Sequence, residues 1–187
     1  MVRKYDSRKR RKVAEQTRID ILEAALKLHW EGITEFEPLA REAGCSVATL
    51  RKYFPNKEVL YQNCTRAFAS TLKMPDLVFL GAISIPKRRT ELCVSELCRI
   101  HEAMLGYAWL SAHHRKDSPT LDSEMCAYEE LTDAVANIVL PADSPESPLV
   151  RGLLDFLSYR ALRRSGSLSP ERIREELTRL LQQILNP

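Results

Sequence analysis

The stretch from Ser46 to Tyr53 places short uncharged side chains ahead of hydrogen-bond donors. Ser46 is a favourable N-cap for a helix, and Leu50 and Phe54, four residues apart, are spaced to turn inward together. The outward side of this helix then carries Val47, Ala48, Thr49, Arg51, Lys52 and Tyr53. Small side chains let a helix approach base edges in the major groove of DNA, while longer donors reach phosphates. The pattern predicts a helix that contacts DNA.

A second short helix is predicted immediately before it. Thr34 and Glu37 stand three residues apart, as in a capping box, where each side chain bonds to the other residue's backbone amide. Its apolar face consists of Leu39, Ala40 and Ala43. Gly44 is placed to end this helix in the left-handed conformation. Two helices joined in this way form a helix-turn-helix, in which Thr34 and the later Lys57 are further candidates for contact with DNA.

These residues carry a family resemblance. From residue 17 to residue 60 the chain resembles the DNA-binding domain of the TetR family of bacterial transcriptional regulators. The matching positions are Thr17-Arg18, Ile21-Leu22, Ala24-Ala25, Leu28, Leu39-Ala40, Ala43-Gly44, Ser46, Thr49-Leu50, Tyr53-Phe54 and Lys57-Glu58. The resemblance implies an all-α fold with an N-terminal helix-turn-helix domain followed by a helical ligand-binding and dimerisation domain. It also implies a ligand-responsive regulator, most often a repressor released from its operator by a small molecule.

Three features depart from the family pattern. The connection over residues 28–34 is shorter than usual and has Ile33 where an aromatic residue is common. Arg51 stands where the family usually has a tyrosine. Glu37 and Pro38 occupy positions where a basic or small polar residue is common. Because of these departures, no operator sequence can be transferred by analogy.

Charge is distributed unevenly along the chain. Residues 1–57 contain 13 Lys/Arg and 8 Asp/Glu, a balance of +5, whereas the remainder contains 15 and 17, a balance of −2. A basic patch beside a helix-turn-helix is typical of a protein that binds double-stranded DNA. We therefore expect a basic flexible arm at 1–12, a helix-turn-helix domain at 13–57 and a helical ligand-binding and dimerisation domain at 58–187.

The basic arm allows two interpretations. The charged residues of the arm and of residues 13–18 are Arg3, Lys4, Asp6, Arg8, Lys9, Arg10, Arg11, Lys12, Glu15 and Arg18. No apolar stretch follows, so the segment does not have the pattern of a signal peptide. It is either a solvated tail or an arm that lies along phosphates or enters a minor groove.

Composition argues against several other classes of protein. The chain has 187 residues, 44% apolar and 28% charged, as in an ordinary globular protein, and no apolar window long enough to span a bilayer. Five cysteines without paired spacing argue against a disulfide scaffold and a zinc site. We expect a cytoplasmic protein without metal or cofactor. No nucleophile–base pair, paired carboxylates or glycine-rich phosphate loop is found, so no catalytic residues and no enzyme activity are expected.

Helical periodicity continues to the end of the chain and predicts an all-α fold. Asn56 can cap a helix that ends near Met74-Pro75. Residues 77–85 are ambiguous between a helix and a buried loop. Further helices are predicted at about 86–115, 119–140 and 147–165, and a last one begins at Ser169-Pro170.

Two residue sets in this part of the chain are candidates for function. The predicted binding site for a small organic ligand consists of Cys98, His101, Met104, Ala108, Trp109, Met125 and Tyr128. The predicted homodimer interface consists of Leu153, Leu157, Ala161, Leu177, Leu181 and Ile184. For both sets the alternative is ordinary core packing within one chain. A two-fold dimer would bind a palindromic operator, with its half-sites about 34–36 Å apart.

Two mechanisms remain open at this point. In the first, a ligand among the central helices shifts the helix that begins at Lys57 and so changes the separation of the two DNA-contacting helices. In the second, the chain is an architectural or non-sensing DNA-binding dimer without a ligand pocket. A cavity lined by the 92–128 segment would distinguish them.

Overall fold

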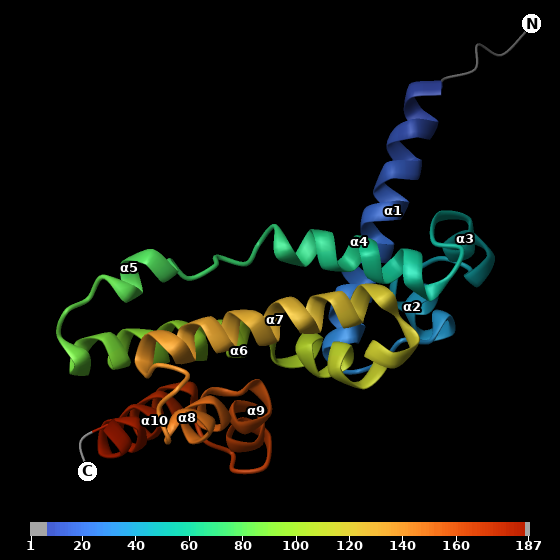
Figure 1. Cartoon of the computed structure of the whole chain (residues 1–187). Helices are drawn as coiled ribbons and strands as arrows, with labels where there is room; N and C mark the ends of the chain where they lie inside the picture. The colour runs from blue at the N-terminus through green and yellow to red at the C-terminus, as the bar shows by residue number, and fades with distance from the viewer. Residues whose placement is uncertain (1–6, 186–187) are drawn as a thin grey trace, which may run out of the picture. The chain divides into compact units, whose positions relative to one another are not determined.

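The structure, a computed structural model, describes residues 7–185, with side chains from Arg10 onwards, and this part of the chain contains helices and no strand. The helices are α1 (Ser7–Trp30), α2 (Phe36–Glu42), α3 (Val47–Tyr53), α4 (Lys57–Ala69), α5 (Leu77–Gly81), α6 (Pro86–His114), the 3-10 turn η1 (Arg115–Asp117), α7 (Pro119–Val139), α8 (Ser147–Leu154), α9 (Phe156–Arg164) and α10 (Pro170–Leu185) (Figure 1). The predicted all-α fold is confirmed.

The helices are divided between two compact units. Unit 1 holds the chain up to Thr71 together with Trp109–Asp122, and unit 2 holds Leu72–Ala108 and the chain from Ser123. Residues 58–71 and 109–122 therefore belong to the same compact unit as the helix-turn-helix. Both α6 and α7 contribute residues to both units.

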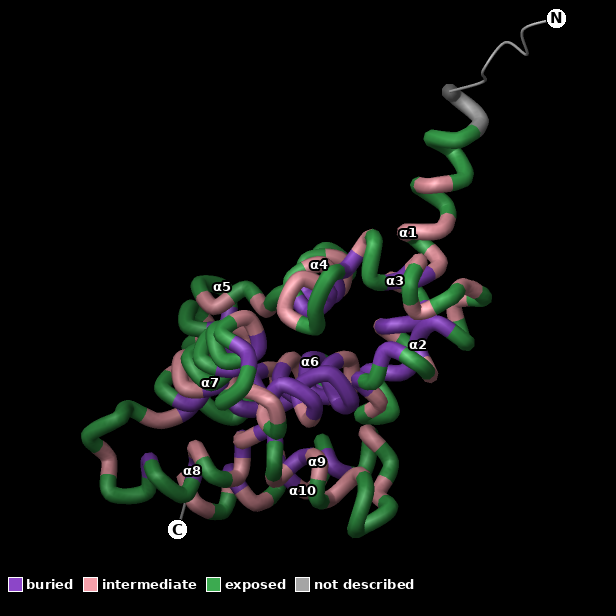
Figure 2. Tube along the Cα trace, turned by 90° about the vertical axis from the view of Figure 1, so that its right-hand side faces the viewer, coloured by how far each residue is buried: buried purple, intermediate pink, exposed green. Residues whose placement is uncertain are grey.

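Unit 1 is built on one face of α1. Its buried residues recur at helical spacing and are Ile21, Ala24, Ala25, Leu28 and His29. Helix α1 packs against α2 and α4, and α2 packs against α3. Residues Arg10–Val13, nearer the start of the helix, are exposed (Figure 2). The second half of α1 is thus the support on which the helix-turn-helix rests.

Two glycines make the tight connections of unit 1. Gly32 has φ +82° and Gly44 has φ +64°, both in the left-handed region that side chains disfavour. Each follows a helix end closed by a six-to-one hydrogen bond, from the Ile33 amide to the Leu28 carbonyl (2.9 Å) and from the Cys45 amide to the Ala40 carbonyl (2.9 Å). The predicted role of Gly44 is confirmed, and Gly32 explains how the short connection after α1 is closed.

The predicted capping box at Thr34 and Glu37 is wrong. Helix α2 begins at Phe36, its N-cap is Glu35, and no side chain caps it. The Thr34 hydroxyl is buried and instead accepts a hydrogen bond from Lys57 Nζ (2.9 Å), while Glu37 is exposed. The tertiary contact with Lys57 replaces the local cap.

Two predicted helix ends also differ from the structure. Helix α4 ends at Ala69, because the Ser70 and Thr71 hydroxyls bond back to the carbonyls of Ala67 and Phe68 (both 2.7 Å). The helix predicted at 147–165 is divided at Asp155, which has an extended backbone and caps α9 through the Leu157 amide (2.7 Å).

The ambiguous segment 77–85 contains the short helix α5. Only Leu80 of this helix is buried, whereas Val78 is 85% exposed and Phe79 is 58% exposed. The buried-loop interpretation is therefore wrong for this segment.

The core of unit 2 contains a buried polar cluster centred on His101 of α6. Its Nδ1 pairs with the Tyr128 hydroxyl, and its Nε2 lies 2.9 Å from the Leu154 carbonyl oxygen. Burial lowers the pKa of His101 to about 4, against a smaller opposing effect of the Leu154 hydrogen bond. The ring is therefore neutral at pH 7, with Nε2–H donating to Leu154 and Nδ1 accepting from Tyr128. Phe156 and Tyr159 pack around it, with ring centroids 6.0 and 5.3 Å away.

We expect His101→Leu to destabilise the protein by about 2–4 kcal/mol, because it leaves the Tyr128 hydroxyl and the Leu154 carbonyl buried without a hydrogen bond. Urea unfolding of the full chain measures this. The exposed Glu130→Ala on α7 is the control and should change the free energy of unfolding by less than about 0.5 kcal/mol. Equal stabilities of His101→Leu and wild type would contradict the assigned cluster.

Candidate nucleic-acid interface

Helix α3 presents the predicted DNA-contacting residues on the surface of unit 1. The Ser46 hydroxyl accepts a hydrogen bond from the Thr49 amide (3.1 Å), which confirms the predicted N-cap. Leu50 and Phe54 are 0% and 1% exposed and hold the inner side of the helix. The residues on its outer side are exposed or half-buried and are Val47, Ala48, Thr49, Arg51, Lys52 and Tyr53.

Two arginines of unit 1 lie over aromatic rings. The guanidinium carbon of Arg51 is 5.4 Å from the centre of the Phe36 ring, and that of Arg18 is 5.8 Å from the Phe54 ring. Arg18 also donates to Asn63 Oδ1 (2.5 Å). A guanidinium over a ring face is held in place while its outer N–H groups stay available. Arg51 is thereby positioned at the end of α3, where donors to phosphate are expected.

A shallow hollow of about 320 Å³ lies between the start of α2, the end of α3 and the start of α4. Its lining consists of Glu35, Phe36, Glu37, Arg51, Pro55, Asn56 and Lys57. Lys57 Nζ bonds to the Thr34 hydroxyl and lies 3.8 Å from Glu35 Oε1. Hydrogen bonds from its own amide and from the Thr34 amide lower the pKa of Glu35. The edge of this surface thus carries cations and carboxylates in close alternation.

Thr34 lies below this surface. It is 2% exposed, so its hydroxyl holds Lys57 and is not placed to contact a phosphate itself. The structure brings the other eight predicted DNA-contacting residues to the exposed or half-buried surface of unit 1.

The basic N-terminal segment continues α1. Its first six residues lie outside the described part of the chain, and Ser7–Lys12 are helical. The first turn of α1 contains no acidic residue, and the sequence at 8–12 is entirely basic. Cations at a helix N-terminus oppose the macrodipole and repel one another. An anionic partner would relieve both effects.

The predicted ligand-binding residues are mostly packed into the core. Cys98, Met104, Ala108 and Met125 are buried, as are the paired His101 and Tyr128. Cys98 also lines an open hollow of about 570 Å³ between α6 and α10. Trp109 is half-buried in unit 1, with its ring 3.7 Å from that of His113. The sequence spacing placed Cys98, His101, Met104 and Ala108 on one helical face but gave no measure of how completely neighbouring helices fill the space beside it.

The predicted dimer residues divide into two groups. Leu177 and Leu181 are 2% and 0% exposed within one chain and belong to its core, so they leave no surface for a second copy. Ile184 is half-buried. The other three, with Leu149, are exposed or half-buried apolar residues of two neighbouring helices: Leu149 and Leu153 on α8, and Leu157 and Ala161 on α9. We call this set the 149–161 strip, in which Leu149 is 55% and Leu157 is 54% exposed.

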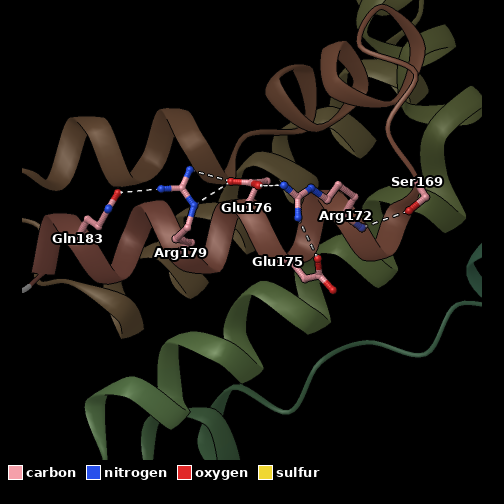
Figure 3. A network of polar contacts seen from close by, with 6 residues as sticks. All are labelled: Ser169, Arg172, Glu175, Glu176, Arg179 and Gln183. Carbon is pink, nitrogen blue, oxygen red and sulfur yellow. Dashed lines mark hydrogen bonds and ion pairs between the residues drawn. The ribbon is translucent and has the colours of Figure 1, made fainter.

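A row of ion pairs covers the outward side of α10. Arg172 pairs with Glu175 (3.4 Å) and Glu176 (2.5 Å), and Arg179 pairs with Glu176 (2.7 Å) and donates a hydrogen bond to Gln183 Oε1 (3.3 Å) (Figure 3). The apolar side of α10 faces its own chain through Ile173, Leu177 and Leu181. The exposed apolar surface near the C-terminus is therefore on α8 and α9.

Neither a candidate metal site nor a helix able to cross a membrane is found among the described residues. No group of three or more His, Cys, Asp or Glu side chains in this part of the chain could hold a metal ion. No helix between residues 7 and 185 is long and apolar enough to cross a membrane.

His29 was not singled out by its sequence pattern. It is 0% exposed at the end of α1, and neither ring nitrogen has a hydrogen-bond partner among the described residues. Its ring lies 5.4 Å from that of Tyr61. Burial, and then the charges of Lys57 and His114, lower the pKa of His29 to about 4. Nothing in the spacing of a lone histidine on an apolar face distinguishes this site from ordinary core.

We expect the stability of the protein to fall as the pH decreases from 6.5 towards 4. Unfolded His29 takes up a proton near pH 6.5, whereas the folded residue resists it until about pH 4, so the unfolded state binds more protons in between. Between pH 6.5 and pH 5, His29 contributes about 2 kcal/mol to this loss.

Urea unfolding at several pH values measures this contribution. His29→Phe should flatten the pH dependence, although the buried His101 keeps a share of it. Replacement of the exposed His113 by alanine should leave the wild-type profile unchanged. A His29→Phe profile identical to that of wild type would rule out the buried neutral imidazole.

Comparisons with known proteins establish similarity of fold. No protein-family profile and no curated protein matches the chain. The structure of a HlyIIR mutant protein that carries a linker with two thrombin sites is similar at 18% identity, over 88% of this chain and 98% of that one, with a TM-score of 0.57. A TetR transcriptional regulator from Rhodococcus sp. RHA1 aligns at 17% identity, over 94% and 99% of the two chains, with a TM-score of 0.43. At these identities the likeness to HlyIIR shows a shared fold over most of the chain.

Proposed function

We propose that this chain is a sequence-specific DNA-binding transcriptional regulator. One observation carries the proposal: a capped, well-packed α3 presents small side chains and then donors on the surface of the basic unit. Val47, Ala48 and Thr49 have the size to approach base edges, and Arg51, Lys52 and Tyr53 have the reach for phosphates. Lys57 adds a cation at the start of the next helix.

The basic start of α1 supports a nucleic-acid partner. Residues 8–12 at the start of α1 are all basic, and basic residues at a helix N-terminus repel one another and oppose the helix dipole. Phosphates alongside would neutralise these charges and release bound counterions, which contributes affinity with little sequence preference. We propose that this part of α1 runs along the DNA backbone.

The proposed regulator acts as a homodimer in the cytoplasm. One recognition helix covers few base pairs, whereas two copies related by a two-fold axis double the contacts on a palindromic operator. The 149–161 strip offers an exposed apolar surface for this association, and Ile184 lies half-buried on the neighbouring α10.

A small organic ligand would release the dimer from its operator, most simply as a repressor. A nearly complete switch requires about 10⁴-fold preference of the ligand for the DNA-incompetent state, or about 5.5 kcal/mol. Two ligand sites in a dimer would share this requirement. The open hollows between α6 and α10 are candidate entry points for such a ligand.

A second candidate function is an architectural or non-sensing DNA-binding dimer. The observation that favours it is the filled core of unit 2, where both nitrogens of His101 have partners and the predicted ligand-binding residues around it are buried. Thermal-shift screening of small organic molecules against the full chain would separate the two functions.

Selection of binding sites from random duplex DNA at physiological salt tests the proposed function directly. A two-fold symmetric consensus is the expected result. Weak, salt-sensitive binding without a consensus would favour the architectural function. Absence of any DNA binding would eliminate both.

We expect Lys57→Ala and Arg51→Ala each to weaken binding to all duplex sequences and to lower the slope of log K against log salt by about 0.9, because each removes one phosphate contact. Fluorescence anisotropy at several salt concentrations measures the slope. Lys87→Ala removes an exposed lysine of unit 2 and should leave the slope unchanged. If Lys57→Ala and Arg51→Ala both leave the slope unchanged, the DNA does not contact the surface formed by α3 and the start of α4.

We expect Leu157→Lys to shift the protein from dimer to monomer, because it puts a charge into the centre of the 149–161 strip. Sedimentation velocity at micromolar concentration would detect the shift. Val78→Lys changes a more exposed apolar residue outside the strip, and should not affect the oligomeric state. If Leu157→Lys stays dimeric, the strip is not the interface.

A further inference from the structure

Glu58 joins two parts of unit 1 that are sixty residues apart in sequence. Its carboxylate accepts hydrogen bonds from the Ser118 hydroxyl (2.5 Å), the Thr120 hydroxyl (2.5 Å) and the Thr120 amide (3.0 Å). Glu58 lies in the first turn of α4, and Ser118 and Thr120 lie at the start of α7. We call these three residues the Glu58 clamp.

Ser118 forms hydrogen bonds both with Glu58 and with the first turn of α7. Its side-chain oxygen accepts a hydrogen bond from the Leu121 amide (3.2 Å) and so caps α7, while its hydroxyl proton goes to Glu58. Ser118 is 2% exposed and Leu121 is 0% exposed. Burial alone would raise the pKa of Glu58, but the hydrogen bonds from Ser118 and Thr120 outweigh it and lower the pKa. The clamp therefore holds an ionised carboxylate at neutral pH.

The residue before Glu58 is the candidate phosphate contact Lys57. Its side chain bonds to Thr34 in the connection between α1 and α2. Asn56 caps the same turn by accepting from the Val59 amide (2.9 Å). The first turn of α4 is thus attached to the helix-turn-helix through Lys57 and to the start of α7 through Glu58.

The clamp attaches α4 to a helix, α7, that continues without a break into unit 2. After Ala69 the chain of α4 passes through non-helical residues 72–76. Helix α7 runs without interruption from Pro119 to Val139, and its residues from Ser123 onwards belong to unit 2. A rotation or shift of α7 reaches Glu58 directly, whereas the irregular segment after α4 absorbs displacement.

We propose that Glu58 is a positioning residue, which transmits the placement of α7 to Lys57 and so sets the affinity for DNA. This inference rests on the proposed function, because its main readout is DNA binding. In this proposal the movement reaches the DNA-binding surface through the start of α7. The mechanism expected from the sequence instead relied on a shift of the helix that begins at Lys57.

Simple electrostatics and the clamp make opposite predictions. Removal of a carboxylate near phosphate strengthens DNA binding by relief of repulsion. If Glu58 positions Lys57, its removal weakens binding although the protein becomes more basic. Glu37→Ala, which removes an exposed carboxylate of α2 with the same change in net charge, is the matched control.

The experiment measures affinity for the selected duplex by fluorescence anisotropy, using full-length Glu58→Gln, Ser118→Ala, Thr120→Val and Glu37→Ala. We expect Glu58→Gln to bind on the order of tenfold more weakly and Glu37→Ala to bind as tightly as wild type or tighter. Ser118→Ala and Thr120→Val should weaken binding without any change in charge. Lys57→Ala combined with Glu58→Gln should lose no more affinity than Lys57→Ala alone. Glu58→Gln binding as tightly as wild type, or more tightly, would overturn the proposal.

Amide hydrogen exchange tests the clamp without DNA. In Glu58→Gln the Thr120 amide should exchange at least about tenfold faster, while amides in the core of unit 2, such as that of Leu177, keep their protection. Unchanged exchange at Thr120 would overturn the clamp whatever the DNA result. If the Thr120 amide exchanges faster in Glu58→Gln but the protein binds no duplex, the clamp is upheld as a structural contact. The proposed function and the positioning role of Glu58 would then both be refuted.

Discussion

The first turn of α4 is the point on which unit 1 depends. Three consecutive residues, Asn56, Lys57 and Glu58, cap the helix, bond to the buried Thr34 and accept the donors at the start of α7. Each of these contacts satisfies a polar group that would otherwise be costly to bury or leave exposed at a helix end. The Lys57–Thr34 bond attaches this turn to the connection before α2, and α2 packs against α3, the helix that we propose contacts DNA.

Charge near this turn is balanced locally. Lys57 lies beside Glu35, and the neutral His29 is buried close to Lys57 and His114. A protonated His29 would add an uncompensated charge to an interior that already borders two basic groups. The site therefore keeps its cations directed to the surface, where a polyanion would meet them, and keeps its interior uncharged.

Unit 2 uses its polar groups differently. His101, Tyr128 and the Leu154 carbonyl satisfy one another in the core, while Glu102 binds Arg163 (2.7 Å) and accepts from the Tyr159 hydroxyl (2.7 Å). A satisfied network fixes how α6, α7, α8 and α9 pack against each other. Exposed apolar residues of unit 2 include Val78 and Phe79 on α5 and Leu149 and Leu157 on α8 and α9, while α10 turns its charged residues outward (Figure 3). The 149–161 strip is the surface that we propose for a second copy of the chain.

The sequence by itself determined the elements whose signals are local. The caps at Ser46, Asn56 and Ser169, the left-handed Gly44 and the helical period predicted α3, α4, α10 and the all-α fold, because such interactions join residues close in the chain. The sequence failed where a distant residue competes with a local partner. Thr34 bonds to Lys57 instead of forming a capping box, and Leu177 and Leu181 are consumed by their own chain's core. Only the tertiary structure decided these choices, together with the burial of His29 and the pairing of Glu58 with the start of α7. Each depends on how segments far apart in the sequence pack against one another.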